Sequence, residues 1–421
     1  MKNLFIILIS LLTLISTWGC TSDETEETIL QAKSELSRNL TPDVSETQLG
    51  ELVSGNTEFA LNLYEELVAL ESGNIFYSPH SISIAMAMTW AGALGDTASQ
   101  MADVLQFGSV AEEVHAAFNA LDLELSSRGT SDPEEFRLEI ANAIWGQDGY
   151  GFLQSFLDTL ALNYGSGLFL LDFFADPENS RITINDWVAE NTEDRIKDLL
   201  PEGSVTNNTK LVLTNAIYFK ADWNTKFHPD STYTGEFTQL NDSKVSVDMM
   251  NAQISLPHYQ GANFSTVEMP YKGEDISMVV ILPDEGEFEN VEAAFNAELL
   301  SDIDSGFLTT DMILTFPKFS YEYKISLKDI FVDMGMTDAF DFGKADLSGM
   351  DGTNELYIMD VLHKAFVAVD EEGTEAAAAT GVIVGDTSIP SVTFNANRPF
   401  IYLIRDRVTG AILFVGRVVE L

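Results

Sequence analysis

Few side chains in this sequence could do chemistry, and their spacing argues against catalysis. Ser78, Ser81, Asn215 and His363 include the nucleophile and base types of a hydrolase. No acidic partner and no Gly-x-Ser-x-Gly turn accompanies them. The five histidines show no metal-ligand spacing, and no cofactor motif occurs. We therefore expect no enzyme activity, no metal and no cofactor.

The most unusual spacing is a row of small residues near the C-terminus. Thr374, Ala376, Ala378 and Thr380 lie two apart, so in a strand they would all face one way. A row of small side chains could slide between two existing strands without steric resistance. Gly373 precedes the row, where the backbone must swing over. By itself the segment fits either a loop that becomes a buried strand or a flexible Ala/Gly linker.

The elements that must position this segment follow from the hydrophobic periodicity. Apolar residues three and four apart predict helices, and runs of β-branched and aromatic residues predict strands. The predicted helices cover residues 56–70, 78–88, 112–125, 152–164 and 181–192. The predicted strands cover residues 136–145, 210–220, 264–270, 277–282, 312–319, 358–369, 391–404 and 411–419. Helices crowd the first half and strands the second, which predicts a mixed α+β fold with large, mostly antiparallel sheets.

The composition excludes some classes of partner. The chain of 421 residues is 45% hydrophobic, which is typical of a globular protein. It carries 66 acidic and 22 basic residues and a formal net charge of -44, so nucleic acid is repelled. Solubility, or life in a salty medium, accounts for the acidity. One cysteine cannot form an internal disulfide, so the core alone must hold the fold.

The first fifty residues are typical of a targeting segment and a tether. Residues 4–15 form an apolar run too short to span a bilayer but suited to a signal peptide. Gly19 precedes the single cysteine, Cys20, as in a bacterial lipoprotein cleavage site. We expect a signal peptide over 1–19, a lipid-anchored flexible tether over 20–50 and one domain over 51–421. The protein would then lie in the bacterial cell envelope or at the cell surface, with plain secretion as the alternative.

Several segments together resemble the serpin family of serine protease inhibitors. The segment from Glu371 to Thr380 resembles the reactive-loop hinge of inhibitory serpins. Its residues are Glu371, Glu372, Gly373, Thr374, Glu375, Ala376, Ala377, Ala378, Ala379 and Thr380. In order along the chain, residues 74–82, 92–101, 214–223, 269–271 and 394–400 resemble further segments of the family. The resemblance covers about residues 55–421.

The resemblance implies a fold and a mechanism. The fold would have three β-sheets, eight or nine helices and an exposed reactive loop at about residues 371–390. The protein would act on serine proteases, and on cysteine proteases as secondary targets, as a suicide substrate. Cleavage of the loop would be followed by its insertion into the main sheet. We expect a monomer. The alternative is a non-inhibitory serpin that acts as a surface binding protein, and the uninterrupted row of small residues favours inhibition.

The resemblance also assigns roles to individual residues. Counting fourteen residues from the hinge glycine places the reactive bond between Thr387 and Ser388. A small β-branched residue at that bond, with no Lys or Arg in 371–390, favours an elastase-like or subtilisin-like protease. Ser78, Ser81, Asn215 and His363 match the polar cluster beneath the main sheet where its strands part. The resemblance implies that they form a buried hydrogen-bond network that rearranges on insertion. Trp223 is expected at the top of that sheet, where insertion begins.

Overall fold

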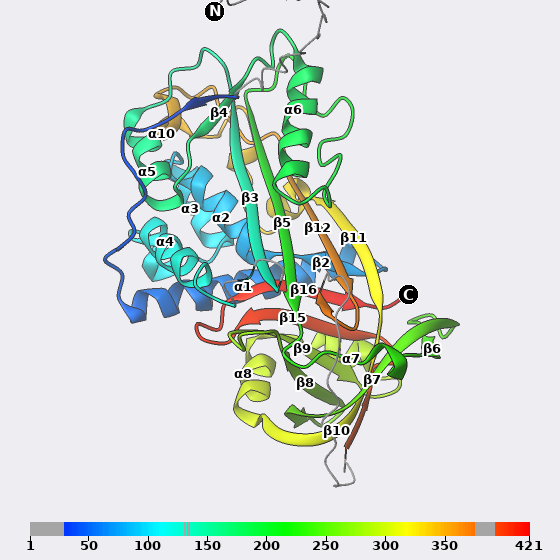
Figure 1. Cartoon of the computed structure of the whole chain (residues 1–421). Coiled ribbons are helices and arrows are strands. Elements are labelled where there is room, and N and C mark those ends of the chain that lie inside the picture. The colour runs from blue at the N-terminus through cyan, green and yellow to red at the C-terminus, as the bar shows by residue number, and fades with distance from the viewer. Residues whose placement is uncertain (1–28, 130–131, 133–134, 375–391) are drawn as a thin grey trace, which may run out of the picture.

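Sixteen strands and ten α-helices make up the described part of the chain, residues 29–129, 132, 135–374 and 392–421 of a computed structural model (Figure 1). The α-helices are α1 (Glu46–Leu70), α2 (Pro79–Trp90), α3 (Gly95–Val104), α4 (Val114–Leu125), α5 (Gln154–Tyr164), α6 (Pro177–Glu190), α7 (Phe288–Ala293), α8 (Ala297–Gly306), α9 (Lys328–Asp333) and α10 (Ser348–Asp351). None of the described helices is long and apolar enough to cross a bilayer.

The strands form two hydrogen-bonded sheets. The first has the order β1 (Leu30–Ala32), β4 (Leu168–Leu171), β3 (Phe136–Gln147), β5 (Leu211–Asp222), β13 (Gly373–Thr374), β12 (Val361–Val369) and β11 (Phe319–Ser326). The second has the order β14 (Val392–Asn395), β10 (Leu308–Pro317), β7 (Lys244–Gln260), β8 (Phe264–Pro270), β9 (Ile276–Pro283), β15 (Phe400–Asp406), β16 (Ile412–Val418) and β2 (Ile75–Tyr77), with β6 (Tyr233–Thr238) paired to β7.

Strand β7 explains why the described residues hold two sheets where three are expected. Its first residues pair with β6, its middle with β10 and its last three with β8. A single strand of 17 residues therefore joins the second and third expected sheets into one ladder. The helix count also differs from eight or nine, because the described residues include the short helices α7 and α9 of six residues and α10 of four.

The core has two parts on opposite faces of the first sheet. Helices α1 to α5 lie on one face, and α6 lies on the other (Figure 1). The smaller cluster lies between the sheet and α6, where Trp145 stacks on Phe169 and meets Trp187 edge-on. The larger cluster joins the first group of helices to both sheets. Apolar packing on both faces of the first sheet therefore stabilises the positions of β5 and β12.

The N-terminal part of the domain starts earlier than the sequence suggests. Helix α1 begins at Glu46, ten residues before the predicted start, after a capping box between Ser45 and Gln48. Ahead of it, β1 pairs with β4, and Arg38 binds Asp122 at 2.6 Å. Residues 29–50 therefore pack on the domain and are not part of the flexible tether expected over 20–50. Cys20 and the leader lie outside the described residues.

Candidate functional site

The hinge forms the short strand β13 between β5 and β12. Gly373 pairs with Asp222 of β5, and Thr374 pairs with Ala221 of β5 and with Val369 of β12. Below it, β5 and β12 pair directly in parallel, from Leu213 and Val361 to Ile217 and Ala365. The first sheet is therefore split at one end by the hinge and closed along the rest. The expected exposed loop does not begin at residue 371, because Gly373 and Thr374 are buried in the sheet.

Thr374 is already buried in this state, with 2% of its surface exposed. Its hydroxyl forms a 2.6 Å hydrogen bond with the Tyr271 hydroxyl, and Tyr271 stacks on Trp223 with 4.6 Å between ring centroids. Burial raises the pKa of Tyr271, although the bond to Thr374 lowers it slightly, so the phenol stays protonated. Sequence reasoning missed Tyr271, since only the fold brings β8's end beneath the hinge.

Gly373 is required by the close approach of β5. A Cβ atom at this position would lie 2.0 Å from the Ala221 carbonyl oxygen. No side chain can be accommodated there without moving the backbone of β5. The glycine is therefore fixed by packing in the sheet, whereas the sequence suggested only a bend in the chain.

Trp223 holds the turn between β12 and β13. Its backbone N–H donates to the Glu372 carbonyl at 2.7 Å, and its indole N–H donates to the Asp370 carbonyl at 3.0 Å. The Phe227 N–H donates to the Glu371 carbonyl at 2.9 Å. The segment after β5 thus supplies three donors to a turn whose own carbonyls would otherwise be buried without partners.

Two lysines anchor the acidic pair of the hinge. Lys318 lies 2.6 Å from Glu371, and Lys226 lies 2.5 Å from Glu372 and 2.7 Å from Asp222. Burial raises the pKa of Glu371, but hydrogen bonds from Lys318 and Thr232 outweigh it and lower the pKa overall. The acids were found from the sequence. The lysines were not, because they lie far away along the chain and carry no motif.

The four predicted polar residues meet beneath the closed part of the first sheet. His363 Nε2 accepts the Ser78 N–H at 3.2 Å, and His363 Nδ1 lies 2.5 Å from Asn215 Oδ1. The Asn215 amide donates at 2.7 Å to the Ser81 hydroxyl and to Asn142 Oδ1. Asn142 of β3 is a fifth member that the sequence analysis missed. The cluster bridges β3, β5, β12 and the start of α2.

In this geometry the four residues do not form a serine–histidine catalytic pair, because both ring nitrogens of His363 are engaged. Burial lowers the pKa of His363 to about 3, so its ring is neutral at pH 7. A neutral ring with its proton on Nδ1 satisfies both contacts, because Nδ1–H donates to Asn215 and Nε2 accepts a backbone N–H. Nε2 therefore has no lone pair free to activate a serine. The cluster cross-links strands, and it must rearrange if β5 and β12 separate.

The remaining predicted site residues lie outside the described residues. These are Glu375, Ala376, Ala377, Ala378, Ala379, Thr380, the reactive-bond pair Thr387 and Ser388, and Cys20. The chain leaves the first sheet at Thr374 and enters the second at Val392, where β14 pairs in parallel with β10. The two ends of the loop are thus fixed on different sheets.

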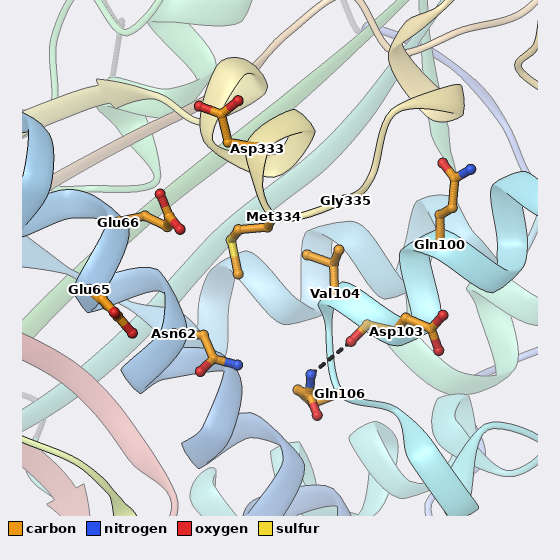
Figure 2. Close-up of a pocket in the computed structure, with 10 residues that line it drawn as sticks. All are labelled: Asn62, Glu65, Glu66, Gln100, Asp103, Val104, Gln106, Asp333, Met334 and Gly335. Atoms are coloured by element: carbon orange, nitrogen blue, oxygen red, sulfur yellow. Dashed lines mark hydrogen bonds between the residues drawn. The ribbon is translucent and has the colours of Figure 1, made fainter.

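A separate acidic hollow of about 490 Å³ lies between α1, α3 and the end of α9 (Figure 2). Glu65, Glu66, Asp103 and Asp333 line it, and the Gln106 amide donates to the Asp103 carbonyl at 2.8 Å. Within the described residues, no three His, Cys, Asp or Glu side chains are arranged to hold a metal ion. None of the lining residues belongs to the hinge or the polar cluster.

Comparisons with known proteins agree on one family. The family model "Serpin (serine protease inhibitor)" matches residues 54–421. The chain is 39% identical to antithrombin-III of Mus musculus, over 90% of this chain and 83% of that protein. It is 39% identical to the leukocyte elastase inhibitor of Homo sapiens, over 87% of this chain and 98% of that protein. The native state of tengpin, a thermophilic serpin, superposes with a TM-score of 0.80 at 29% identity, over 93% and 98% of the two chains.

Proposed function

The chain belongs to the serpin family, and we propose that it inhibits a serine protease as a suicide substrate by inserting its cleaved loop into the first sheet. The observation that carries the proposal is β13. Gly373 and Thr374 already occupy the first positions of a new strand between β5 and β12. A cleaved loop extends this strand by continuing along the same two partners.

Insertion replaces the direct pairing of β5 with β12. The parallel bridge between them gives way to two antiparallel ladders, one on each side of the inserted segment. Ala376, Ala378 and Thr380 would follow Thr374 onto the face of the sheet toward the core. Their small size lets the segment enter without overpacking. A non-inhibitory binding role is not favoured, because a loop that never inserts does not need small side chains at every second position.

The chemistry belongs to the protease. Its serine attacks the carbonyl carbon of the reactive bond, the leaving amine takes a proton from its histidine, and an acyl-enzyme forms. The released N-terminal side of the loop, still esterified to the protease, inserts and carries the enzyme along. Hydrolysis of the ester stalls when the protease site is distorted. The inhibitor contributes no catalytic group.

We propose Thr387–Ser388 as the reactive bond and an elastase-like or subtilisin-like enzyme as the target. Thr387 is small and β-branched, and the loop lacks Lys and Arg. The relationship to the leukocyte elastase inhibitor supports this class of protease. Mass spectrometry of the denatured complex reads the cut directly, and a C-terminal fragment that begins at another residue would move the assignment.

The test of the mechanism is a covalent complex. We expect a band stable in SDS after incubation with pancreatic elastase or subtilisin. Ala378→Arg should abolish this band while the loop is still cut, because insertion would bury an unpaired charge at a cost of several kcal/mol. Glu375→Arg is the matched control, since its side chain would face the other side of an inserted strand. If Ala378→Arg forms the complex as well as wild type, loop insertion is not the mechanism.

We also propose that Cys20 is acylated and that the protein is a monomer anchored to the bacterial cell envelope. The apolar leader at residues 4–15 and the small residue before the only cysteine support the anchor. Labelling with a palmitate analogue should mark wild type and leave Cys20→Ala unmarked. An unlabelled wild type would favour plain secretion.

A further inference from the structure

A cavity of about 240 Å³ lies next to the hinge, between β7, β8, β10 and the segment after β5. Its floor consists of buried apolar side chains, namely Trp223, Phe227, Leu256, Met269 and Leu314. Sites for drug-sized molecules measure about 300–1,000 Å³. This cavity therefore suits a smaller molecule, of the size of an indole with a short side chain.

The rim of the cavity carries the solvent-exposed carboxylate of Glu274. Glu274 accepts a hydrogen bond from the Asn224 amide at 2.8 Å, and its carboxylate has no Lys, Arg or His nitrogen within 4.0 Å among the described residues. Arg407, the one cation in the described lining, lies 3.4 Å from Glu268 and donates to the Glu274 backbone carbonyl. The Glu274 carboxylate therefore offers an acceptor for a cation at the rim of the cavity.

The charge of Arg407 is matched within its own cluster. Glu268 also pairs with Arg405 at 2.9 Å, and Arg405 pairs with Asp304 at 2.5 Å. Two arginines thus face two carboxylates, and their charges cancel. Burial raises the pKa of Glu268, but the two arginines outweigh it and keep that carboxyl ionised. Glu274 is left as the free charge, in a chain whose formal net charge is -44.

We propose that this cavity binds a small aromatic amine, with its ring on the Trp223 floor and its ammonium group at the Glu274 carboxylate. The ring would bury apolar surface against Phe227 and Leu314. This site goes beyond protease inhibition, which requires no small ligand.

The cavity is coupled to the hinge through shared residues. Trp223 and Phe227 form its floor and also supply the three donors that hold residues 370–372. A ligand packed on these side chains binds better to the arrangement in which the three hydrogen bonds are made. Displacing the hinge by Gly373→Val should therefore weaken binding about fivefold, a modest coupling between sites.

Isothermal titration calorimetry of the full chain with three indole probes tests the site. Tryptamine, which is cationic, should bind with a Kd of about 10–100 μM. Neutral N-acetyltryptamine should bind more weakly, and anionic indole-3-propionate more weakly still. Glu274→Gln should weaken tryptamine about threefold, the size expected for an ion pair to an exposed carboxylate, and leave N-acetyltryptamine unchanged. If indole-3-propionate binds as tightly as tryptamine, or Glu274→Gln has no effect, the charge assignment is wrong.

A cavity-filling variant tests the location. Ala252 lines the cavity opposite Leu314 of β10. Ala252→Phe should abolish binding of tryptamine and N-acetyltryptamine, whereas Ala175→Phe, at an exposed position, should not. A folded Ala252→Phe variant with wild-type affinity would overturn the proposal. If that variant does not fold, the Glu274→Gln titration decides. Protease inhibition is not part of these measurements, so a failure here leaves the proposed function standing.

Discussion

Gly373 shows how one missing side chain permits the hinge to enter the sheet. The Ala221 carbonyl oxygen occupies the space where a Cβ atom would be, at 2.0 Å. Thr374 follows in the sheet, and its buried hydroxyl forms a hydrogen bond with the Tyr271 hydroxyl in place of water. The intact state therefore has two residues already inserted, and further insertion starts at residue 375.

Gly373→Val should remove β13 from the sheet. The added side chain cannot coexist with the β5 backbone, so the pairing of Gly373 and Thr374 is lost. We expect the free energy of unfolding to fall by about 1–3 kcal/mol in urea titrations. The protease should also hydrolyse more molecules of this variant for each protease molecule that is inhibited, which is measured as the stoichiometry of inhibition.

Gly50→Ala is the control for this prediction. Gly50 lies within α1, and a Cβ there would meet no atom within 4 Å. This variant should be neutral or stabilising by up to about 1 kcal/mol, since alanine favours a helix. Equal stability of Gly373→Val and wild type would mean that β13 contributes nothing to the intact state.

His363 of strand β12 is one of three buried histidines that make the stability of the protein depend on pH. Burial lowers the pKa of His363 to about 3 and those of His80 and His115 to about 4. The unfolded chain takes up these protons near pH 6.5, whereas the folded chain does not. Stability is therefore fully present above about pH 6.5 and declines as pH falls toward the folded-state values.

His363→Gln should reduce that pH dependence. Each buried histidine contributes a slope of up to about 1.4 kcal/mol per pH unit below pH 6.5. In urea titrations between pH 7 and pH 4.5, the free energy of unfolding should fall less steeply with falling pH for the variant than for wild type. The difference in slope should be about that of one buried histidine. Carboxylates act equally on both proteins and cancel in the difference. Parallel curves would mean that His363 is protonated without cost in the folded state.

At the scale of the whole molecule, β5 and β12 pair directly below the hinge, and insertion of the loop would separate them. Cleavage at the reactive bond should let the loop extend β13, bury its small side chains and complete both ladders. The cleaved protein should melt at least about 10 °C above the intact protein in calorimetry. Ala378→Arg, with a charge in the inward row, should show a smaller rise. Equal melting temperatures of intact and cleaved wild type would contradict a strained native state.

The sequence by itself determined the family, the α+β class and most elements. Strand β8 matches its predicted range of 264–270, and α2 begins as predicted at Pro79 after Ser78. It also identified the hinge and four members of the polar cluster. The elements follow from local patterns of periodicity and capping. The family, the hinge and the polar cluster follow from the resemblance of several segments to serpins.

Only the tertiary structure decided how far the hinge is inserted and what holds it. The lysines Lys226 and Lys318, the Tyr271 hydroxyl and Asn142 come from distant segments and have no local signature. Merging of the sheets through β7 depends on one strand finding three partners. These contacts arise from packing between elements far apart in sequence, and their energies depend on burial that no local pattern reveals.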